Sequence, residues 1–109
     1  MGIVNRFAKY LTCIEYPKQK SSWNIAGILK GQNGLYKFDV RNMEQISSGE
    51  WAKKGSTKSS ADKMVFEFER YWIIVDIPEL HKYLKITKTR IVHLEELLKC
   101  LDWNIKLSK

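Results

Sequence analysis

The sequence predicts a single α/β domain with a mixed sheet, and three observations carry this prediction. Asn33-Gly34 stands between two apolar runs, which is a strong hairpin signal because a type I′ turn needs positive φ at both central residues. The continuous apolar run at 71–75 is typical of a buried central strand and leads directly into a helix start. The chain has 109 residues, of which 44% are hydrophobic, enough for one modest core.

The first half of the chain predicts a helix, a hairpin and a long loop. Apolar residues in 2–14 recur with a period near 3.6, which predicts an amphipathic helix that ends before Pro17. The hairpin strands are expected at 23–29 and 36–41. Residues 42–60 are rich in Ser, Gly and Lys and predict a long loop with little regular structure, of the kind that is often functional.

The second half alternates strands and helices. Asp76 and Glu79 have the spacing of a capping box at the start of a helix. We expect a short helical turn at 59–63, a half-buried strand over 64–68, strands over 71–76 and 90–92, and helices over 77–85 and 93–101. The helix over 2–14 should cover one face of the sheet, and the two later helices the other side or the sheet edge.

The charge balance favours a polyanionic partner. Formal net charge is +7, which points first to nucleic acid, although a basic surface also serves solubility alone. Phosphate contacts are expected at Lys37, Arg41, Lys53, Lys54 and Lys58, with Trp51 stacking on a base or fixing the loop to the core. A solvated loop is the alternative. The chain has no apolar run of membrane-spanning length, and two distant cysteines suit a reducing cytoplasm.

Asn24 and the pair Asp39/Arg41 lie on the two predicted arms of the hairpin, so pairing of the arms would bring them together. Magnesium-dependent nucleases need two carboxylates and a Lys at such positions, because carboxylate oxygens hold the hard cation that activates water. The stretches Trp23-Asn24-Ile25 and Phe38-Asp39-Val40-Arg41 resemble the motifs of the PD-(D/E)XK superfamily, which includes restriction enzymes and Holliday-junction resolvases. Residues 59–76 are similar to phage-type members.

This resemblance covers residues 2–85 and implies a restriction-endonuclease-like fold. It also implies an impaired site: Asn5 or Arg6 stands where the family has Glu, Asn24 where it has Asp, and Arg41 where it has Lys. Asp39 keeps its carboxylate and is the metal-ligand candidate, and Arg41 could pair with it.

These departures predict a DNA-binding protein with weak or no cleavage and no cofactor, Mg²⁺ being needed only if activity survives. Four alternatives stay open. The chain could be an active Mg²⁺-dependent endonuclease or resolvase. It could be a small phage or mobile-element inhibitor or interaction protein without nucleic-acid binding. It could be a structural subunit that uses the strand over 64–69 to pair with another chain, and a homodimer is compatible with these readings. Asp39-Val40-Arg41 could also be an ordinary strand end with solvated charges.

Overall fold

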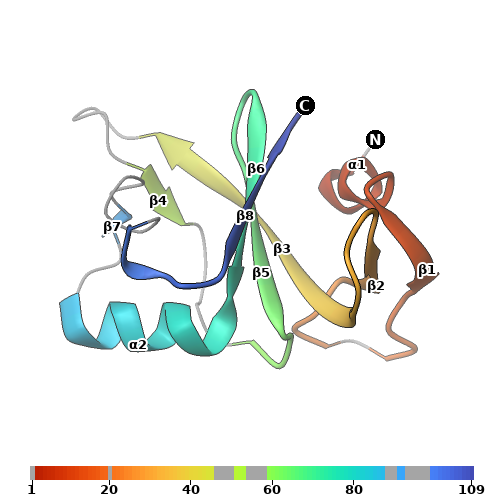
Figure 1. Cartoon of the computed structure of the whole chain (residues 1–109), viewed down its shortest axis with the longest axis horizontal. Helices are drawn as coiled ribbons and strands as arrows, with labels where there is room; N and C mark the ends of the chain where they lie inside the picture. The colour runs from red at the N-terminus through yellow and green to blue at the C-terminus, as the bar shows by residue number, and fades with distance from the viewer. Residues whose placement is uncertain (1, 20, 46–50, 54–58, 88–90, 93–98) are drawn as a thin grey trace.

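The chain forms a mixed β-sheet flanked by helices (Figure 1). This is a computed structural model that describes residues 2–19, 21–45, 51–53, 59–87, 91–92 and 99–109, with the backbone alone described for 43–45, 51–53, 87 and 91–92. In chain order the elements are α1 (Ile3–Ala8), β1 (Leu11–Glu15), β2 (Ile25–Leu29), β3 (Leu35–Gln45), β4 (Trp51–Lys53), β5 (Lys63–Glu67), β6 (Tyr71–Asp76), α2 (Ile77–Thr87), β7 (Ile91–Val92) and β8 (Asn104–Ser108). The predicted α/β class is confirmed.

The main path of the sheet runs β1-β2-β3-β5-β6-β8. Strands β3 and β5 are parallel, and the other neighbours on this path are antiparallel. The far end of β3 leaves this path and pairs with β4, which in turn pairs with β7. The four strands expected at 23–29, 36–41, 64–68 and 71–76 are therefore neighbours, as β2, β3, β5 and β6.

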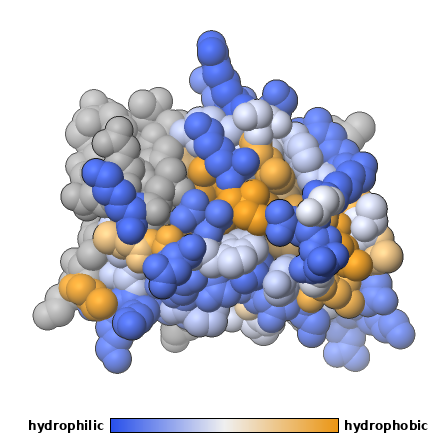
Figure 2. All heavy atoms as spheres, in the orientation of Figure 1, coloured by the Kyte–Doolittle hydropathy of each residue, from blue (hydrophilic) through white to orange (hydrophobic). Residues whose placement is uncertain are grey.

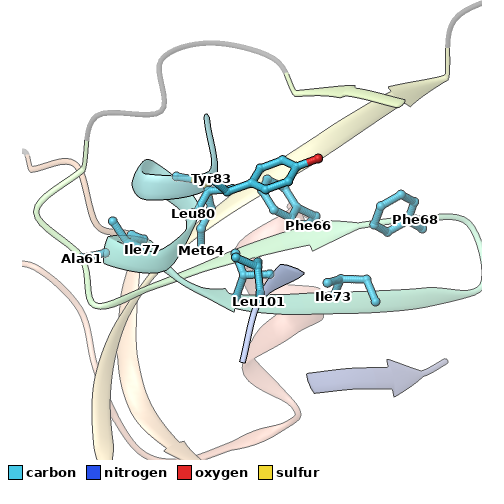
Figure 3. Close-up of a cluster of buried hydrophobic side chains, with 10 residues drawn as sticks. Ala61, Met64, Phe66, Phe68, Ile73, Ile77, Leu80, Tyr83 and Leu101 are labelled. Carbon is cyan, nitrogen blue, oxygen red and sulfur yellow. The ribbon is translucent and has the colours of Figure 1, made fainter. Parts of the chain in front are cut away.

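The core lies on both faces of β5 and β6, because successive side chains of a strand point to opposite faces. One group, the α2-side cluster, is drawn in Figure 3 and consists of Ala61, Met64, Phe66, Phe68, Ile73, Val75, Ile77, Leu80, Tyr83 and Leu101. The other, the α1-side cluster, consists of Phe7, Leu11, Ile25, Leu29, Phe38, Val40, Val65, Trp72 and Ile74. The two helices lie on opposite sides of the sheet, as Figure 1 shows.

The N-terminal prediction was wrong beyond Ala8. Leu11–Glu15 is a strand rather than the continuation of a helix, and Leu11 pairs with Leu29 of β2. Leu11 and Ile14 fit a helical period, but Thr12 and Ile14 are β-branched and pairing with β2 supplies the hydrogen bonds of the segment. The pairing shifts between Thr12 and Glu15, where Cys13 takes φ 54°, so β1 carries a bulge.

The hairpin of β2 and β3 exists, but its turn differs from the predicted one. Strand β2 ends at Leu29 and β3 begins at Leu35, so five residues connect the strands. The amide of Gln32 donates to the carbonyl of Leu29 over 2.9 Å, and Gly31 has φ 83° at the third position of this turn, as a type II turn requires. Gly34 also has positive φ but Asn33 does not, which excludes the type I′ turn.

The middle of the chain departs from the sequence-based prediction in three respects. Residues 42–45 and 51–53 belong to β3 and β4 rather than to an irregular loop. Residues 60–62 form bends instead of a helical turn, and Lys63 already begins β5. Strand β5 is central and buried on both faces rather than half-buried, so it cannot pair with another chain. The alternation of apolar and polar residues in its sequence suggested one solvent-exposed face, but in the structure both kinds of side chain are covered.

The end of the chain contains a strand that the sequence reading missed. Ile105 and Leu107 alternate with polar residues in β8, which pairs with β6 and forms one edge of the main sheet path. The predicted helix over 77–85 is α2, and Asp76 caps it by accepting from the amide of Glu79 over 3.3 Å. Of the helix predicted over 93–101, residues 93–98 lie outside the described part of the chain. Residues 99–100 are helical, and Leu101 is not.

Candidate functional site

The structure brings the three predicted site residues together at the start of the β2–β3 hairpin. Asn24 precedes β2, yet its amide donates to the carbonyl of Phe38 over 2.8 Å and so extends the ladder by one residue. The next residue, Ile25, pairs with Phe38, so Asn24 lies at the end of the paired ladder, close to Asp39. The side-chain oxygen of Asn24 accepts from the amide of Val40 over 2.7 Å. Asn24 is therefore a ladder acceptor for β3, and this bond occupies its oxygen.

Asp39 and Arg41 form a closed ion pair. Arg41 Nε donates to Asp39 Oδ1 over 2.5 Å, and Nη2 donates to Oδ2 over 3.0 Å. The Asp39 side chain is 1% exposed and that of Arg41 is 27% exposed. The hydrogen bonds that Arg41 donates to Asp39, more than the charge of Asp39, raise the pKa of Arg41, against the opposing effect of burial. The pairing anticipated from the sequence is confirmed, and the solvated strand end is excluded because Asp39 is buried.

This geometry leaves little room for a metal ion at Asp39. Both carboxylate oxygens already accept from a guanidinium, and Arg41 places a permanent positive charge at the position that Mg²⁺ would need. Within the part of the chain that the structure describes, no three side chains of His, Cys, Asp or Glu gather at one point. The guanidinium has five N–H donors, of which Asp39 takes two, so Arg41 can still bind a further anion.

The N-terminal helix does not contribute to this site, contrary to the family resemblance. Val40 belongs to the α1-side cluster, so the adjacent Asp39 and Arg41 point to the α2 side of the sheet. Arg6 of α1 lies on the other face and binds Glu67, with its Nη2 2.7 Å from Glu67 Oε1. Lys109 Nζ binds the other oxygen of the same carboxylate over 3.0 Å. These three side chains link α1, β5 and the chain end, which is a structural role.

Lys37 is an exposed cation on the same face of β3 as Arg41. Its ammonium lies 5.4 Å from the centre of the Trp23 ring. Its backbone is fixed by Asp62, whose Oδ2 accepts from the Lys37 amide over 2.9 Å. Of the other predicted nucleic-acid contacts, Lys54 and Lys58 and the side chains of Trp51 and Lys53 lie outside the described residues, so these remain sequence-based predictions.

Sequence reasoning missed three residues beside Lys37. Trp23 packs against the α2-side cluster and is half-buried. Ser22 and Ser60 place their hydroxyl oxygens 2.7 Å apart, and the amide of Ser60 also donates to Ser22 Oγ. Trp23 and Ser22 directly precede Asn24 in the sequence, so their place on the hairpin was predictable. The approach of Ser60 was not, because it depends on how β5 pairs with β3.

A second buried charge, Lys63, has a structural explanation. It is 6% exposed, and its ammonium lies 2.9 Å from Asp76 Oδ1 and 3.7 Å from the centre of the Trp103 ring. This fixes the turn before β8 against β5, and Glu79 adds to it by accepting from the amides of Asp102 and Trp103. Glu79 thus serves the C-terminal turn, and the capping box predicted with Asp76 is formed in one direction.

Figure 2 shows a face on which hydrophilic side chains surround a hydrophobic strip near the middle. In the described part of the chain, no helix has the length and apolarity needed to cross a membrane. Comparison of the chain with protein-family models, with curated proteins and with solved structures finds no match.

Proposed function

We propose that this protein binds nucleic acid through the α2 side of the β2–β3 hairpin and does not cleave it. The observation that carries the proposal is the Asp39–Arg41 pair: a buried carboxylate holds a half-buried guanidinium from one edge. An arginine fixed in this way keeps its fork geometry without further loss of side-chain entropy when it meets a phosphate. The net charge of +7 supports a polyanion as the ligand.

Two cations on one strand favour an extended, repeating anion over a small one. Lys37 and Arg41 are four residues apart on β3, which corresponds to about 13 Å along a strand. A phosphodiester backbone offers negative charges at regular intervals and can contact both. The order of β2, β3, β5 and β6 is compatible with a restriction-endonuclease-like core, and we propose that relationship for the fold.

Loss of cleavage follows from the same contacts. Phosphodiester hydrolysis by this kind of enzyme gains most of its rate from metal charge and a positioned water. Asn24 cannot neutralise Mg²⁺, and its oxygen is engaged with the amide of Val40. Asp39 is engaged with Arg41. The site therefore keeps the anion-binding part of nuclease chemistry without the metal-binding part.

The test is a binding titration with labelled oligonucleotides at low salt. The variant Asp39→Asn/Arg41→Gln leaves the net charge unchanged, so a loss of affinity cannot come from the overall field. We expect it to weaken binding about tenfold, the value of one charge-assisted phosphate contact. Lys85→Gln, in the exposed last turn of α2, is the matched control that lowers net charge away from the site. Unchanged affinity in the double variant would contradict the proposal.

Catalysis is tested on the same preparations with Mg²⁺ and duplex, single-stranded and four-way-junction DNA. The native chain is expected to cut none of them. The double variant Asn24→Asp/Arg41→Lys restores the carboxylate and lysine of the family pattern. Millimolar Mg²⁺ should raise the melting temperature of this variant and leave that of the native chain unchanged. Mg²⁺-dependent cutting by the native chain that Asp39→Ala abolishes would establish the endonuclease alternative instead.

A further inference from the structure

We propose that Trp23, with Lys37 beside it, is a stacking position for an unpaired base, so that the ligand is single-stranded nucleic acid. This inference rests on the proposed function and specifies its ligand. Trp23 is half-buried and packs on the α2-side cluster, and the Lys37 ammonium lies 5.4 Å from the ring centre. A half-buried indole that packs on a hydrophobic cluster is a rigid platform, and the stacking of a base on it needs no sequence-specific contact.

Lys37 can serve the phosphate of the nucleotide that stacks. Its side chain is exposed and has a flexible four-carbon stem, so the ammonium can move from the ring to a nearby phosphate when a base takes its place. The cation–π contact in the free protein shows that the ring is within reach of that ammonium. Arg41, farther along β3 on the same face, can then contact a second phosphate of the same strand.

Two serine hydroxyls beside Trp23 add a donor. Ser22 and Ser60 have two hydroxyl protons between them, and their mutual hydrogen bond uses one. The amide of Ser60 donates to Ser22 Oγ over 2.6 Å, so Ser22 accepts there whichever hydroxyl donates in the mutual bond. The remaining hydroxyl proton can be donated to a phosphate oxygen. Asp62 is an opposing charge in this neighbourhood, but its Oδ2 already accepts from the Lys37 amide.

The backbone around Trp23 is held in place before any ligand arrives. Asn24 donates to Phe38, while Lys37 and Asp62 exchange hydrogen bonds, the Asp62 amide donating to the Lys37 carbonyl over 2.9 Å. These bonds join the segment before β2, the start of β3 and the segment before β5. A duplex cannot use this platform, because the faces of its bases are already stacked on each other.

The experiment compares a labelled oligothymidine with a labelled duplex for the native chain, Trp23→Leu and Trp23→Phe. We expect Trp23→Leu to weaken oligothymidine binding about tenfold with little effect on the duplex, and Trp23→Phe to restore part of the loss. Tyr16→Leu is the matched control, because Tyr16 is 55% exposed and lies outside the site. Equal effects of Trp23→Leu on both ligands, or none, would overturn the inference.

A crosslinking measurement covers the case in which a Trp23 variant folds poorly. An oligothymidine carrying iodouracil is irradiated with the native chain, and the attached peptide is sequenced. Attachment at Trp23 supports the inference, and attachment elsewhere refutes it. The two proposals fail separately: a native chain that binds neither ligand contradicts nucleic-acid binding as a whole, whereas equal binding of both without a Trp23 effect contradicts the single-strand inference alone.

Discussion

Arg41 and Asp39 share two hydrogen bonds but differ in exposure, and this difference determines how each tolerates replacement. Asp39 is 1% exposed and cannot reach water if its partner is removed, whereas the 27% exposed Arg41 can turn outward. A buried charge without a partner costs far more than a solvated one. The stability of the site therefore depends more on the arginine than on the carboxylate.

We expect Arg41→Met to lower the free energy of unfolding by about 3 kcal/mol, because it leaves the Asp39 carboxylate buried and unpaired. Asp39→Asn should cost about 1 kcal/mol, since the amide oxygen still accepts a hydrogen bond from Arg41. Urea denaturation of both variants measures the difference. Equal costs would mean that Asp39 finds another partner when Arg41 is absent.

Glu67 makes stability depend on pH. Two hydrogen bonds from Arg6 lower its pKa below the ordinary value of 4.5, partial burial opposes this, and Lys109 lowers it further. A depressed pKa in the folded state stabilises the protein above pH 4.5, and that stabilisation is lost as pH falls through the folded-state value. The free-energy difference between the native chain and Glu67→Gln should be constant near neutrality and shrink below pH 4.5. A difference independent of pH in acid denaturation experiments would exclude this assignment.

Strand β1 lies at one end of the main sheet path and is attached to it through β2. It forms the edge opposite β8, its residues after Leu11 are exposed, and its pairing with β2 is interrupted by the bulge at Cys13. The close approach of the two strands depends on Gly27, since a Cβ atom there would lie 2.9 Å from the carbonyl oxygen of Thr12 and 3.1 Å from Leu11 Cβ.

Gly27→Ala should therefore lower the free energy of unfolding by about 2 kcal/mol and separate β1 from β2, because a backbone oxygen cannot yield as a flexible side chain can. Hydrogen exchange should show faster exchange in β1 while β5 and β6 stay protected. Gly31→Ala is the control: it has open space but φ 83°, so it should cost about 1 kcal/mol without reaching β1. Uniformly faster exchange after Gly27→Ala would contradict a local effect.

The elements that the sequence predicted correctly are those with strong local signals. The local sequence is enough to predict β6 from its apolar run and the start of α2 from its cap, and the two apolar arms predict the hairpin. The strand β1 was not predictable, because Leu11 and Ile14 fit a helix and only pairing with β2 decides the matter. Likewise, β8 pairs with a strand about 30 residues earlier in the chain, a contact that no local pattern records.

The same division applies to the candidate site. The hairpin brought Asn24 close to Asp39, and the opposite charges of Asp39 and Arg41 predicted their ion pair. The sequence did not reveal that α1 lies on the opposite face, since the assignment of Arg6 to the site came from the family pattern. Side chains alternate between the two faces of the sheet along β3, so the face of Arg41 follows once the face of a neighbour such as Val40 is known. Only the three-dimensional core shows which face Val40 occupies.

The molecule as a whole divides its charges between the two faces of the sheet. On the α1 side, Arg6 and Lys109 bind Glu67, and Lys63 is paired with Asp76. On the α2 side, β3 presents Lys37 and Arg41. The Arg41 guanidinium keeps N–H donors that Asp39 does not use, and the Lys37 ammonium is exposed, so both can still contact an anion. The proposed interface is therefore expected on the α2 side of β3.

The salt dependence of binding tests whether Lys53, Lys54 and Lys58 contribute to the interface. Each lysine that contacts a phosphate releases counterions, so the affinity of the native chain should fall steeply as salt rises. Changing Lys53, Lys54 and Lys58 together to Ala should reduce the slope of log affinity against log salt by about 2 for single strands, and it should weaken binding to all sequences alike, because phosphate contacts do not read bases. The variant Lys30→Ala/Lys82→Ala/Lys85→Ala removes the same charge from other exposed positions and should leave the slope nearly unchanged. Equal slopes for the two triple variants would show that the overall charge of +7, rather than a localised interface, attracts the nucleic acid.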